Sequence, residues 1–346
     1  METINRLPML TWRYLKTNDS TLPFRTPERR AAAKWSDETY FTPGAALPAR
    51  FEGASPAWVD AALAGEAYTV SIPDGADVTL SADILLDSAH PDYAGTYVFR
   101  VGRGARLRLL WKWRGGGEAG TAALSAAYEL AEGARLHVSA AGSGLSGALL
   151  CSQRLVEAAA GAEAELVSAD LGGETVIVHS RGYLDGARAS MKEYGVYAAG
   201  GTQHLDLFYH IDHIGTETES DIEVKGALAG RAKKIFRSTI DFKRGCSGAV
   251  GSEGDYAVQL DPTTKNISLP LLLCTEDNVQ GNHASSAGQI DEGTVYYLMS
   301  RGLTREEARR IVVESLIRPL IDRLDESLRE DALAAVRAKL DEGGNP

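Results

Sequence analysis

The stretch RGARLRLLWKWR at residues 103–114 decides the fold, because it joins a small turn to a strand of alternating pattern. Leu107, Leu109, Trp111 and Trp113 alternate with mainly basic neighbours, which is typical of a strand with one buried face. The same Gly-Ala turn recurs along the chain between other strand-like segments. Its copies lie at residues 74–77, 103–106, 132–135, 160–163 and 185–188, with weaker echoes at Gly230 and Gly245.

The spacing of these turns predicts a solenoid. The five clear copies are separated by about 25 to 29 residues, and repetition at such a period is typical of stacked structural repeats. Glycine suits a corner where the backbone needs a positive φ, and a following alanine packs without bulk between stacked turns. The alternative is an antiparallel β-sandwich, whose turns usually recur every 8 to 12 residues or so. We therefore expect a mainly β protein whose core, residues 67–290, is a parallel β-helix.

The two ends of the chain follow other patterns. Residues 1–66 predict a mixed N-terminal cap with one helix, which Ser55 caps, Pro56 opens and Gly65 follows. Residues 291–346 predict a helical region, about 50 residues long, that is too short to bury its own amphipathic faces. It must pack on the β body, on a partner, or on both.

Three signals divide this C-terminal region into helices. Asp291 can cap a helix that stops at Gly302, and Thr304 with Glu307 forms a capping box for the next one. Pro319 is expected to break or restart that helix.

Composition narrows the classes of function. The 346 residues carry a formal charge of -11 and no long basic run, so nucleic-acid binding has no electrostatic basis. No apolar stretch approaches the roughly 20 residues needed to span a bilayer, and the N-terminus lacks a signal-peptide pattern. Three distant cysteines favour reduced thiols over a disulfide framework or a zinc site. We expect a cytoplasmic protein without a membrane partner.

Common catalytic motifs are absent from the sequence. There is no Gly-Lys dipeptide and hence no phosphate-binding P-loop, so no bound nucleotide is expected, and neither HExxH nor GxSxG occurs. The GxGxxG pattern at residues 142–147 is followed by strand-like sequence instead of a helix, which favours a solenoid turn over a dinucleotide site.

The segment HLDLFYHIDH at residues 204–213 holds three imidazoles and two carboxylates. In a strand His204 and His210 share one face, about 20 Å apart, and His213 lies on the other. One metal ion cannot bridge that distance, so packed or hydrogen-bonded histidines are expected. A metal site would need further ligands from a neighbouring coil.

Four motifs in order give the chain a family resemblance. They are KIFRSTIDFK at 234–243, SLPLLLCTEDNVQGNHASSAGQID at 268–291, VYYLMSRG at 295–302 and TREEA at 304–308, and LPMLTWR at 7–13 also resembles the opening of SufD-type chains. The ordered set, within roughly residues 150 to 320, resembles the SufB/SufD family of iron-sulfur cluster assembly proteins. The resemblance implies a right-handed parallel β-helix flanked by helical regions. It also implies a SufD-like, non-enzymatic scaffold subunit that pairs through its β-helix with a SufB-like chain or with itself, while its C-terminal helices dock a SufC-type ABC ATPase.

The same resemblance nominates site residues. The imidazole of the family's HGA-type turn maps onto His283, which becomes the favoured ligand for transient iron or an iron-sulfur cluster. Departures are Gly281, where many SufD chains have Cys, and Ala284 in place of the usual Gly or Glu. The stretch 261–265 lacks the sulfur-accepting Cys of SufB-like chains, which favours SufD.

Cys274 and Cys246 are secondary candidates for a cluster or sulfur site. Cys274 follows an apolar run, which is typical of a buried small hydrophobe. Cys246 lies at a turn beside Lys243 and Arg244, whose charges are expected to lower its pKa and make it the more reactive thiol.

Two alternatives remain open from the sequence. A cytoplasmic β-helical carbohydrate-active enzyme would need paired carboxylates, but Asp206 and Asp212 would lie about 20 Å apart in one strand. A purely structural binding protein that has lost its ligands is also compatible with Gly281.

Overall fold

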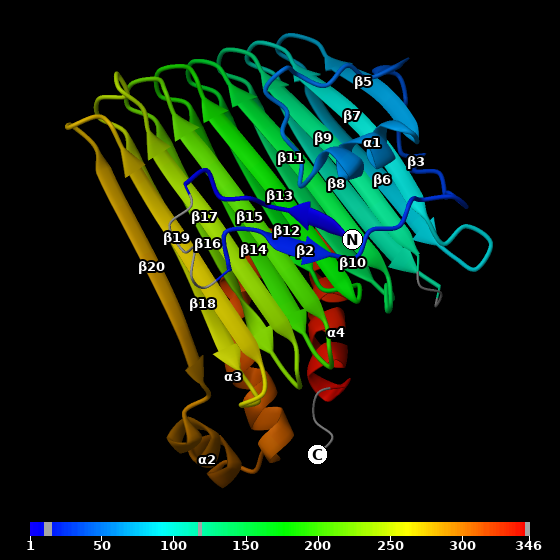
Figure 1. The fold of residues 1–346 in the computed structure, drawn as a ribbon, viewed down its shortest axis with the longest axis vertical. Coiled ribbons are helices and arrows are strands. Elements are labelled where there is room, and N and C mark those ends of the chain that lie inside the picture. Colours follow the sequence, from blue (N-terminus) through cyan, green and yellow to red (C-terminus); the bar gives the residue numbers. More distant parts are fainter. Residues whose placement is uncertain (10–15, 117–119, 343–346) are drawn as a thin grey trace.

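Two nine-stranded sheets form the body of the protein (Figure 1). The computed structural model describes residues 1–9, 16–116 and 120–342, so positions 10–13 of the N-terminal motif lie outside it. The sheet that we call the even sheet contains, in spatial order, β20 (Gln280–Gln289), β18 (Val250–Gln259), β16 (Glu219–Leu228), β14 (Ser190–Ala199), β12 (Glu163–Asp170), β10 (Arg135–Ser143), β8 (Arg106–Gly115), β6 (Asp77–Leu86) and β3 (Lys34–Trp35). The odd sheet contains β19 (Lys265–Cys274), β17 (Lys233–Phe242), β15 (His204–His213), β13 (Thr175–Leu184), β11 (Leu149–Ala158), β9 (Thr121–Leu130), β7 (Tyr93–Val101), β5 (Glu66–Ile72) and β4 (Phe41–Pro43).

The chain winds as a solenoid between these sheets. From β5 to β20 each strand is followed by one in the other sheet, and strands two apart in sequence pair in parallel. Arg135, for example, is in register with Arg106 of the preceding coil and Glu163 of the next. The predicted parallel β-helix is confirmed, and the antiparallel sandwich is wrong. Apolar side chains from both sheets fill the lumen.

The corners explain the turn motif. Gly75, Gly104, Gly133 and Gly161 have φ of 69°, 61°, 66° and 63°, where a side chain would be strained. Alanines that follow them, at positions 105, 134 and 162, are fully buried between stacked turns. Both features were predicted from the repeat.

The fifth turn corrects that prediction. Its positive φ falls at Arg188 (φ 57°) instead of Gly186, and Ala189 takes the buried alanine position. The backbone N–H of Arg188 donates to the carbonyl of Thr216, and that of Gly161 donates in the same way to the carbonyl of Ala187. Arg188 is therefore the equivalent of the corner glycine, and the predicted Gly186 lies two residues too early. Of the weaker echoes, Gly230 has φ 63° but belongs to the opposite edge, between β16 and β17.

The N-terminal region covers the outer face of the odd sheet. It supplies the antiparallel pair β1 (Glu2–Ile4) and β2 (Ser20–Leu22) and the helix α1 (Pro56–Leu63). Pro56 opens this helix as predicted, but Ser55 stands at the N-cap position without the expected capping hydrogen bond from its side chain. Trp58 packs there against Cys151 and Ile177. A buried ion pair, Arg237 Nη1 to Asp206 Oδ1 at 2.8 Å, fastens the segment, because Arg237 also donates to the carbonyl of Thr17 at 2.8 Å.

Helices at the C-terminus cover the outer face of the even sheet. They are α2 (Glu292–Ser300), α3 (Arg305–Ile321) and α4 (Glu326–Glu342). Ile317, Leu320 and Val336 pack with Val167 and Val196 of the sheet, so part of this region packs on the β body. The helix capped by Asp291 ends before Gly302, and the Thr304–Glu307 capping box is formed, as predicted.

Pro319 does not break α3, which runs through it to Ile321. Proline lacks the backbone N–H that would donate one hydrogen bond within the helix. Because only two helical residues follow Pro319, the loss of this hydrogen bond affects only the last turn of α3. Within the described part of the chain, no helix is long and apolar enough to cross a bilayer. The expected cytoplasmic location stays a prediction.

Candidate functional site

The last coil of the solenoid is open on one side. We call β19, β20 and the turn at residues 275–279 the terminal coil. Among the described residues both strands are the outermost members of their sheets, so each has one backbone edge without a described strand beside it. Nearly all of β20 is exposed, and Leu272 of β19 is 38% exposed although its side chain packs beside Gly281, inside the coil. The terminal coil therefore offers strand edges and lumen-facing side chains to another molecule.

His283 lies on this coil, but not in a turn as expected. It is the fourth residue of β20, in register with Glu253 of β18, and is exposed. Register partners of a parallel ladder point to the same side. The imidazole of His283 is thus carried at the open end of the lumen, above a buried carboxyl group.

Glu253 gives this end of the lumen an unusual acid. Its side chain is 3% exposed, and burial raises its pKa to about 8. Below that pH the group beneath His283 is a neutral carboxylic acid. A neutral imidazole is the form that binds metals.

Cys246 and Cys274 lie near each other at one corner beside the terminal coil, and Cys274 is exposed instead of buried as expected. Cys274 ends β19 and is exposed, because no coil stacks on it, and its thiol donates to the carbonyl of Glu276 at 2.9 Å. Cys246 is buried in the turn after β17. Burial, together with the nearby Glu276 carboxylate, raises the pKa of Cys246.

The expected activation of Cys246 is therefore wrong. Lys243, which was expected to lower that pKa, instead binds the carboxylates of Asp212 and Asp241. Cys274 is the accessible thiol of the pair. β20 begins at Gln280, beside the corner that holds the two cysteines. His283 lies three residues further along this strand, about 10 Å from the corner.

Gly281 has a packing reason. A Cβ atom at this position would lie 2.7 Å from a methyl carbon of Leu272 and 3.1 Å from the ring of Phe242. The cysteine found here in many SufD-type chains would not fit unless Leu272 moved. Leu272 thus occupies the space that a side chain at position 281 would need at the mouth of the lumen.

The histidines of β15 separate as predicted. His213 lies in the lumen, hydrogen-bonded to Thr218 and Ser220 at 2.7 and 2.8 Å. His210 lies on the outer face, where its Nε2 is 3.3 Å from Asp212 Oδ2. The neighbouring coil adds Asp241, which the sequence analysis missed, although β17 places it in register with Asp212. In the described ranges, His210, Asp212 and Asp241 are the one group of three such side chains with ligand atoms within 4.8 Å of one another.

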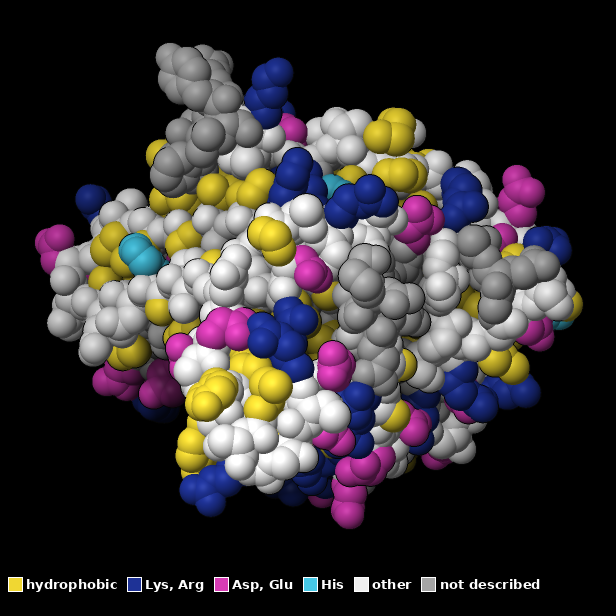
Figure 2. All heavy atoms as spheres, turned by 90° about the horizontal axis from the view of Figure 1, so that it is seen from below, with side chains coloured by type: hydrophobic (Ala, Val, Ile, Leu, Met, Phe, Trp, Pro, Cys, Tyr) yellow, Lys and Arg dark blue, Asp and Glu magenta, His cyan; other side chains and the backbone are white. Residues whose placement is uncertain are grey.

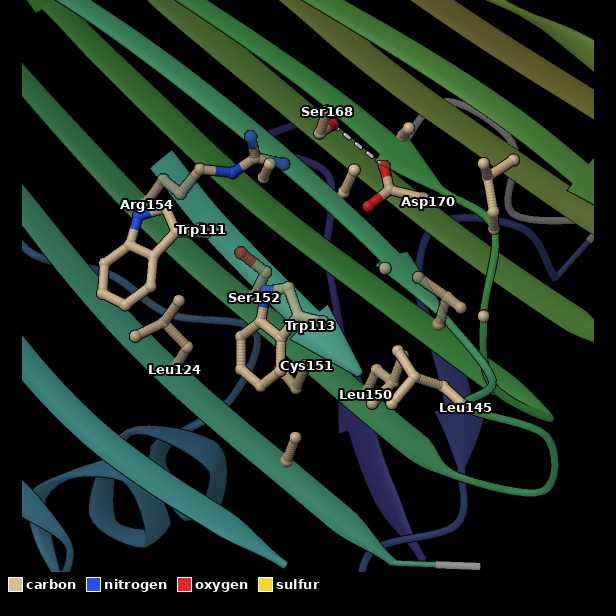
Figure 3. Close-up of a pocket in the computed structure, with 18 of the residues that line it drawn as sticks. Trp111, Trp113, Leu124, Leu145, Leu150, Cys151, Ser152, Arg154, Ser168 and Asp170 are labelled. Carbon is tan, nitrogen blue, oxygen red and sulfur yellow. Dashed lines mark hydrogen bonds between the residues drawn. The ribbon is translucent and has the colours of Figure 1, made fainter. Parts of the chain in front are cut away.

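A cavity of about 80 Å³ lies inside the solenoid between β8 and β13 (Figure 3). Trp111, Trp113 and Leu124 line it, with Arg154 and Asp170 as its charged groups. Burial raises the pKa of Asp170, whose Oδ2 accepts a hydrogen bond from Ser168 at 3.0 Å. The space suits a few water molecules, and none of the predicted site residues lines it.

The terminal coil carries side chains that can bind a ligand. It presents one exposed imidazole and one exposed thiol, both competent ligands for iron or for a cluster. Neither His283, Cys274 nor Cys246 belongs to a group of three ligand atoms within 4.8 Å in the described ranges. A complete coordination sphere at this end would need groups from a second molecule.

Comparison with known proteins gives a consistent result. Residues 85–316 match the family described as "SUF system FeS cluster assembly, SufBD core domain". The iron-sulfur cluster assembly protein SufD of Bacillus subtilis is 30% identical over 159 residues, which are 46% of this chain and 36% of that protein. Iron-sulfur cluster assembly SufBD family proteins of Mycobacterium bovis and Mycobacterium leprae are each 28% identical, over 48% and 50% of this chain and 20% and 47% of their own lengths. The match spans less than half the length of each of these relatives.

Proposed function

The chain belongs to the SufBD core family of iron-sulfur cluster assembly proteins, and from that premise we propose that it is a SufD-like scaffold subunit. In this proposal it is not a catalyst. It pairs with a SufB-like chain, or with a second copy of itself, and works with a SufC-type ABC ATPase that performs the hydrolysis. The observation that carries the proposal is the open terminal coil, which displays His283 in a chain of this family.

The terminal coil is the proposed pairing surface. The free edges of β19 and β20 can add strands from a partner, as in other proteins that bind by extending a sheet. Leu272 and its apolar neighbours on β19 would lose exposed surface on pairing, which supplies a hydrophobic driving force. A partner at this edge would also reach His283 and Cys274, and could complete the ligands that this chain lacks.

The proposed ATPase dock is α2 together with the outer face of α3. The inner faces of α3 and α4 are committed to the even sheet. Tyr296 and Tyr297 of α2 are 75% and 55% exposed, and Ile311 of α3 is 43% exposed. Figure 2 views the molecule from the end where α2 lies and shows hydrophobic side chains at that surface. Exposed tyrosines are frequent anchors of protein interfaces.

We assign His283 as the iron or cluster ligand, with Cys274 as an accessible second. Cys246 is a weaker candidate, because a buried thiol with a raised pKa supplies little thiolate. Iron and sulfur are cargo in this scheme, held in passing between this chain and its partner.

The two alternatives gain no support from the site. Asp206 is bound by Arg237, and Asp212 by Arg181 and Lys243, so neither carboxylate is free for sugar hydrolysis. A purely structural partner would not need an exposed imidazole at the open end of the lumen, where His283 lies.

Co-purification of the tagged chain from its native cells tests the proposal, with associated proteins identified and iron and sulfide assayed. We expect a SufB-like chain and an ABC-type ATPase. Changing Tyr296 and Tyr297 to Ala should weaken ATPase association by at least about tenfold, while Leu85→Ala, exposed on β6, should not. A chain that emerges alone, without an ATPase or iron, would overturn the scaffold assignment. An unchanged complex in the tyrosine variant would move the dock elsewhere.

A further inference from the structure

A second group of ligand-type side chains lies on the outer face of the odd sheet, away from the terminal coil's lumen. His210 and Asp212 are two residues apart on β15 and so point to the same side, and β17 brings Asp241 into register beside Asp212. Their ligand atoms lie within 4.8 Å of one another, and all three residues are buried. This arrangement, two ligands from one strand and one from the next, converges on a single point.

The Nε2 atom of His210 faces this group and makes no well-aligned hydrogen bond. His210 is 3% exposed, its Nε2 has no hydrogen-bond partner, and that atom faces Asp212 Oδ2 at 3.3 Å. A buried polar atom without a partner costs free energy, and a bound ion is one of the arrangements that would satisfy it. The Nε2 atom of His210 is therefore available as a metal ligand and faces the carboxylates of Asp212 and Asp241.

Lys243 already places a positive charge at this point. Its Nζ is 3.0 Å from Asp212 Oδ1 and 2.5 Å from Asp241 Oδ2. The lysine side chain is 44% exposed, whereas those of the two aspartates are 3% and 11% exposed. A lysine on a flexible stem can swing into solvent, while the three buried side chains stay in place.

The net charge around His210, Asp212 and Asp241 would suit a divalent ion in the place of Lys243. Around the group, the carboxylates of Asp212, Asp241 and Glu52 face two cations, Arg181 and Lys243. Arg181 Nη2 is 3.2 Å from Asp212 Oδ2, and the same guanidinium binds Glu52. Without Lys243 the group would carry a net charge of about -2, which one divalent metal ion neutralises.

We propose that His210, Asp212 and Asp241 form a binding site for a divalent transition-metal ion, which displaces Lys243 on binding. One imidazole and two carboxylates form a mixed nitrogen and oxygen set that suits Fe²⁺, Zn²⁺ or Co²⁺. Two ligand atoms of one such ion lie at most about 4.2 Å apart. The observed ligand atoms lie within 4.8 Å of one another, so side-chain movements below about 1 Å would bring all three within bonding distance of one ion. The site does not depend on the scaffold assignment or on a partner chain.

The test is an anaerobic titration of the full chain with Co²⁺, followed by visible absorption, in a His283→Ala, Cys274→Ser background that removes the exposed ligands of the terminal coil. We expect one equivalent of Co²⁺ with absorption typical of nitrogen and oxygen ligands. Lys243→Met should tighten binding by at least about tenfold, and Asp241→Asn should weaken it by at least about tenfold. Lys225→Met is the matched control, because Lys225 pairs with Glu223 on the even sheet.

Thermal unfolding with and without Co²⁺ provides a second measurement. Binding to the folded state should raise the Tm of the background protein and of Lys243→Met, but not that of Asp241→Asn or His210→Asn. Unchanged Co²⁺ affinity in Lys243→Met, or full binding by both ligand variants, would overturn the site. Should one ligand variant fail to fold, the other ligand variant and Lys243→Met still decide the question.

Discussion

The two ends of the solenoid are built in opposite ways. At the N-terminal end, β3 and β4 pair antiparallel with β6 and β5, and an aromatic group closes the lumen. Trp35 stands in its centre, in ring contact with Phe41, Tyr97 and Trp111 at centroid distances of 4.8 to 5.2 Å. At the C-terminal end no strand in the described part of the chain covers β19 or β20, and the lumen ends in His283 above Glu253.

The difference shows which end is available for association. An open sheet edge usually aggregates unless it is blocked, so natural proteins cover such edges or use them. Here the chain covers one end itself, with side chains that only pack, and leaves the other bearing ligands. The closed end should therefore matter for stability, and the open end for assembly.

The largest effect on stability is expected from a substitution at the closed end. Trp35→Ala removes the ring at the centre of the aromatic group and should lower the free energy of unfolding by about 3 kcal/mol, measured by urea denaturation. Leu272→Ala at the open end is the matched control, and should cost less than about 1 kcal/mol because its side chain is already partly exposed. Equal losses from the two variants would contradict the contrast between the ends.

The next effect concerns pH. Glu253 has a pKa of about 8 in the folded protein against 4.5 for an ordinary glutamate, so the folded state holds this proton more tightly. The free energy of unfolding therefore falls as the pH rises from about 4.5 to 8, and the contribution of the protonated Glu253 is fully lost above pH 8. Glu253→Gln should be more stable than the wild type by at least about 2 kcal/mol at pH 9, and the difference should be below about 1 kcal/mol at pH 5.

Urea denaturation across this pH range measures that difference. Glu219→Gln, at an exposed position of β16, is the control variant in the same measurement. A constant difference between Glu253→Gln and the wild type at all pH values would mean that Glu253 is not protonated in the folded state.

The smallest effect on stability is expected at His283. Because its side chain is exposed, His283→Ala should change the free energy of unfolding by less than about 0.5 kcal/mol. The iron and sulfide recovered with the assembled complex should nevertheless fall, whereas Asn282→Ala beside it should leave them unchanged. Unaltered iron and sulfide in the histidine variant would make His283 a structural residue.

Much of the fold was predictable because its signals are local. The Gly-Ala corners with positive φ, the alternating strands and the caps of α2 and α3 depend on residues close together in the chain. The misplaced turn at Arg188 shows the limit of that logic, because pairing with the next coil, and not the Gly-Ala motif, selected the corner residue.

The site was less predictable, because exposure depends on which coil is last. Cys274 follows an apolar run and was expected to be buried, but nothing stacks on β19. Cys246 has basic neighbours in sequence, yet Lys243 turns to two carboxylates on the outer face of the odd sheet.

The sequence by itself determined the repeat, the parallel solenoid, the helical ends and the family resemblance, since each depends on short-range patterns or on ordered motifs. Only the tertiary structure decided which side chains share a point in space. Asp241 joins His210 and Asp212 because one coil of the solenoid brings β17 beside β15. Glu253 becomes a weak acid because the coils around it exclude water, and no local pattern in the sequence encodes that burial.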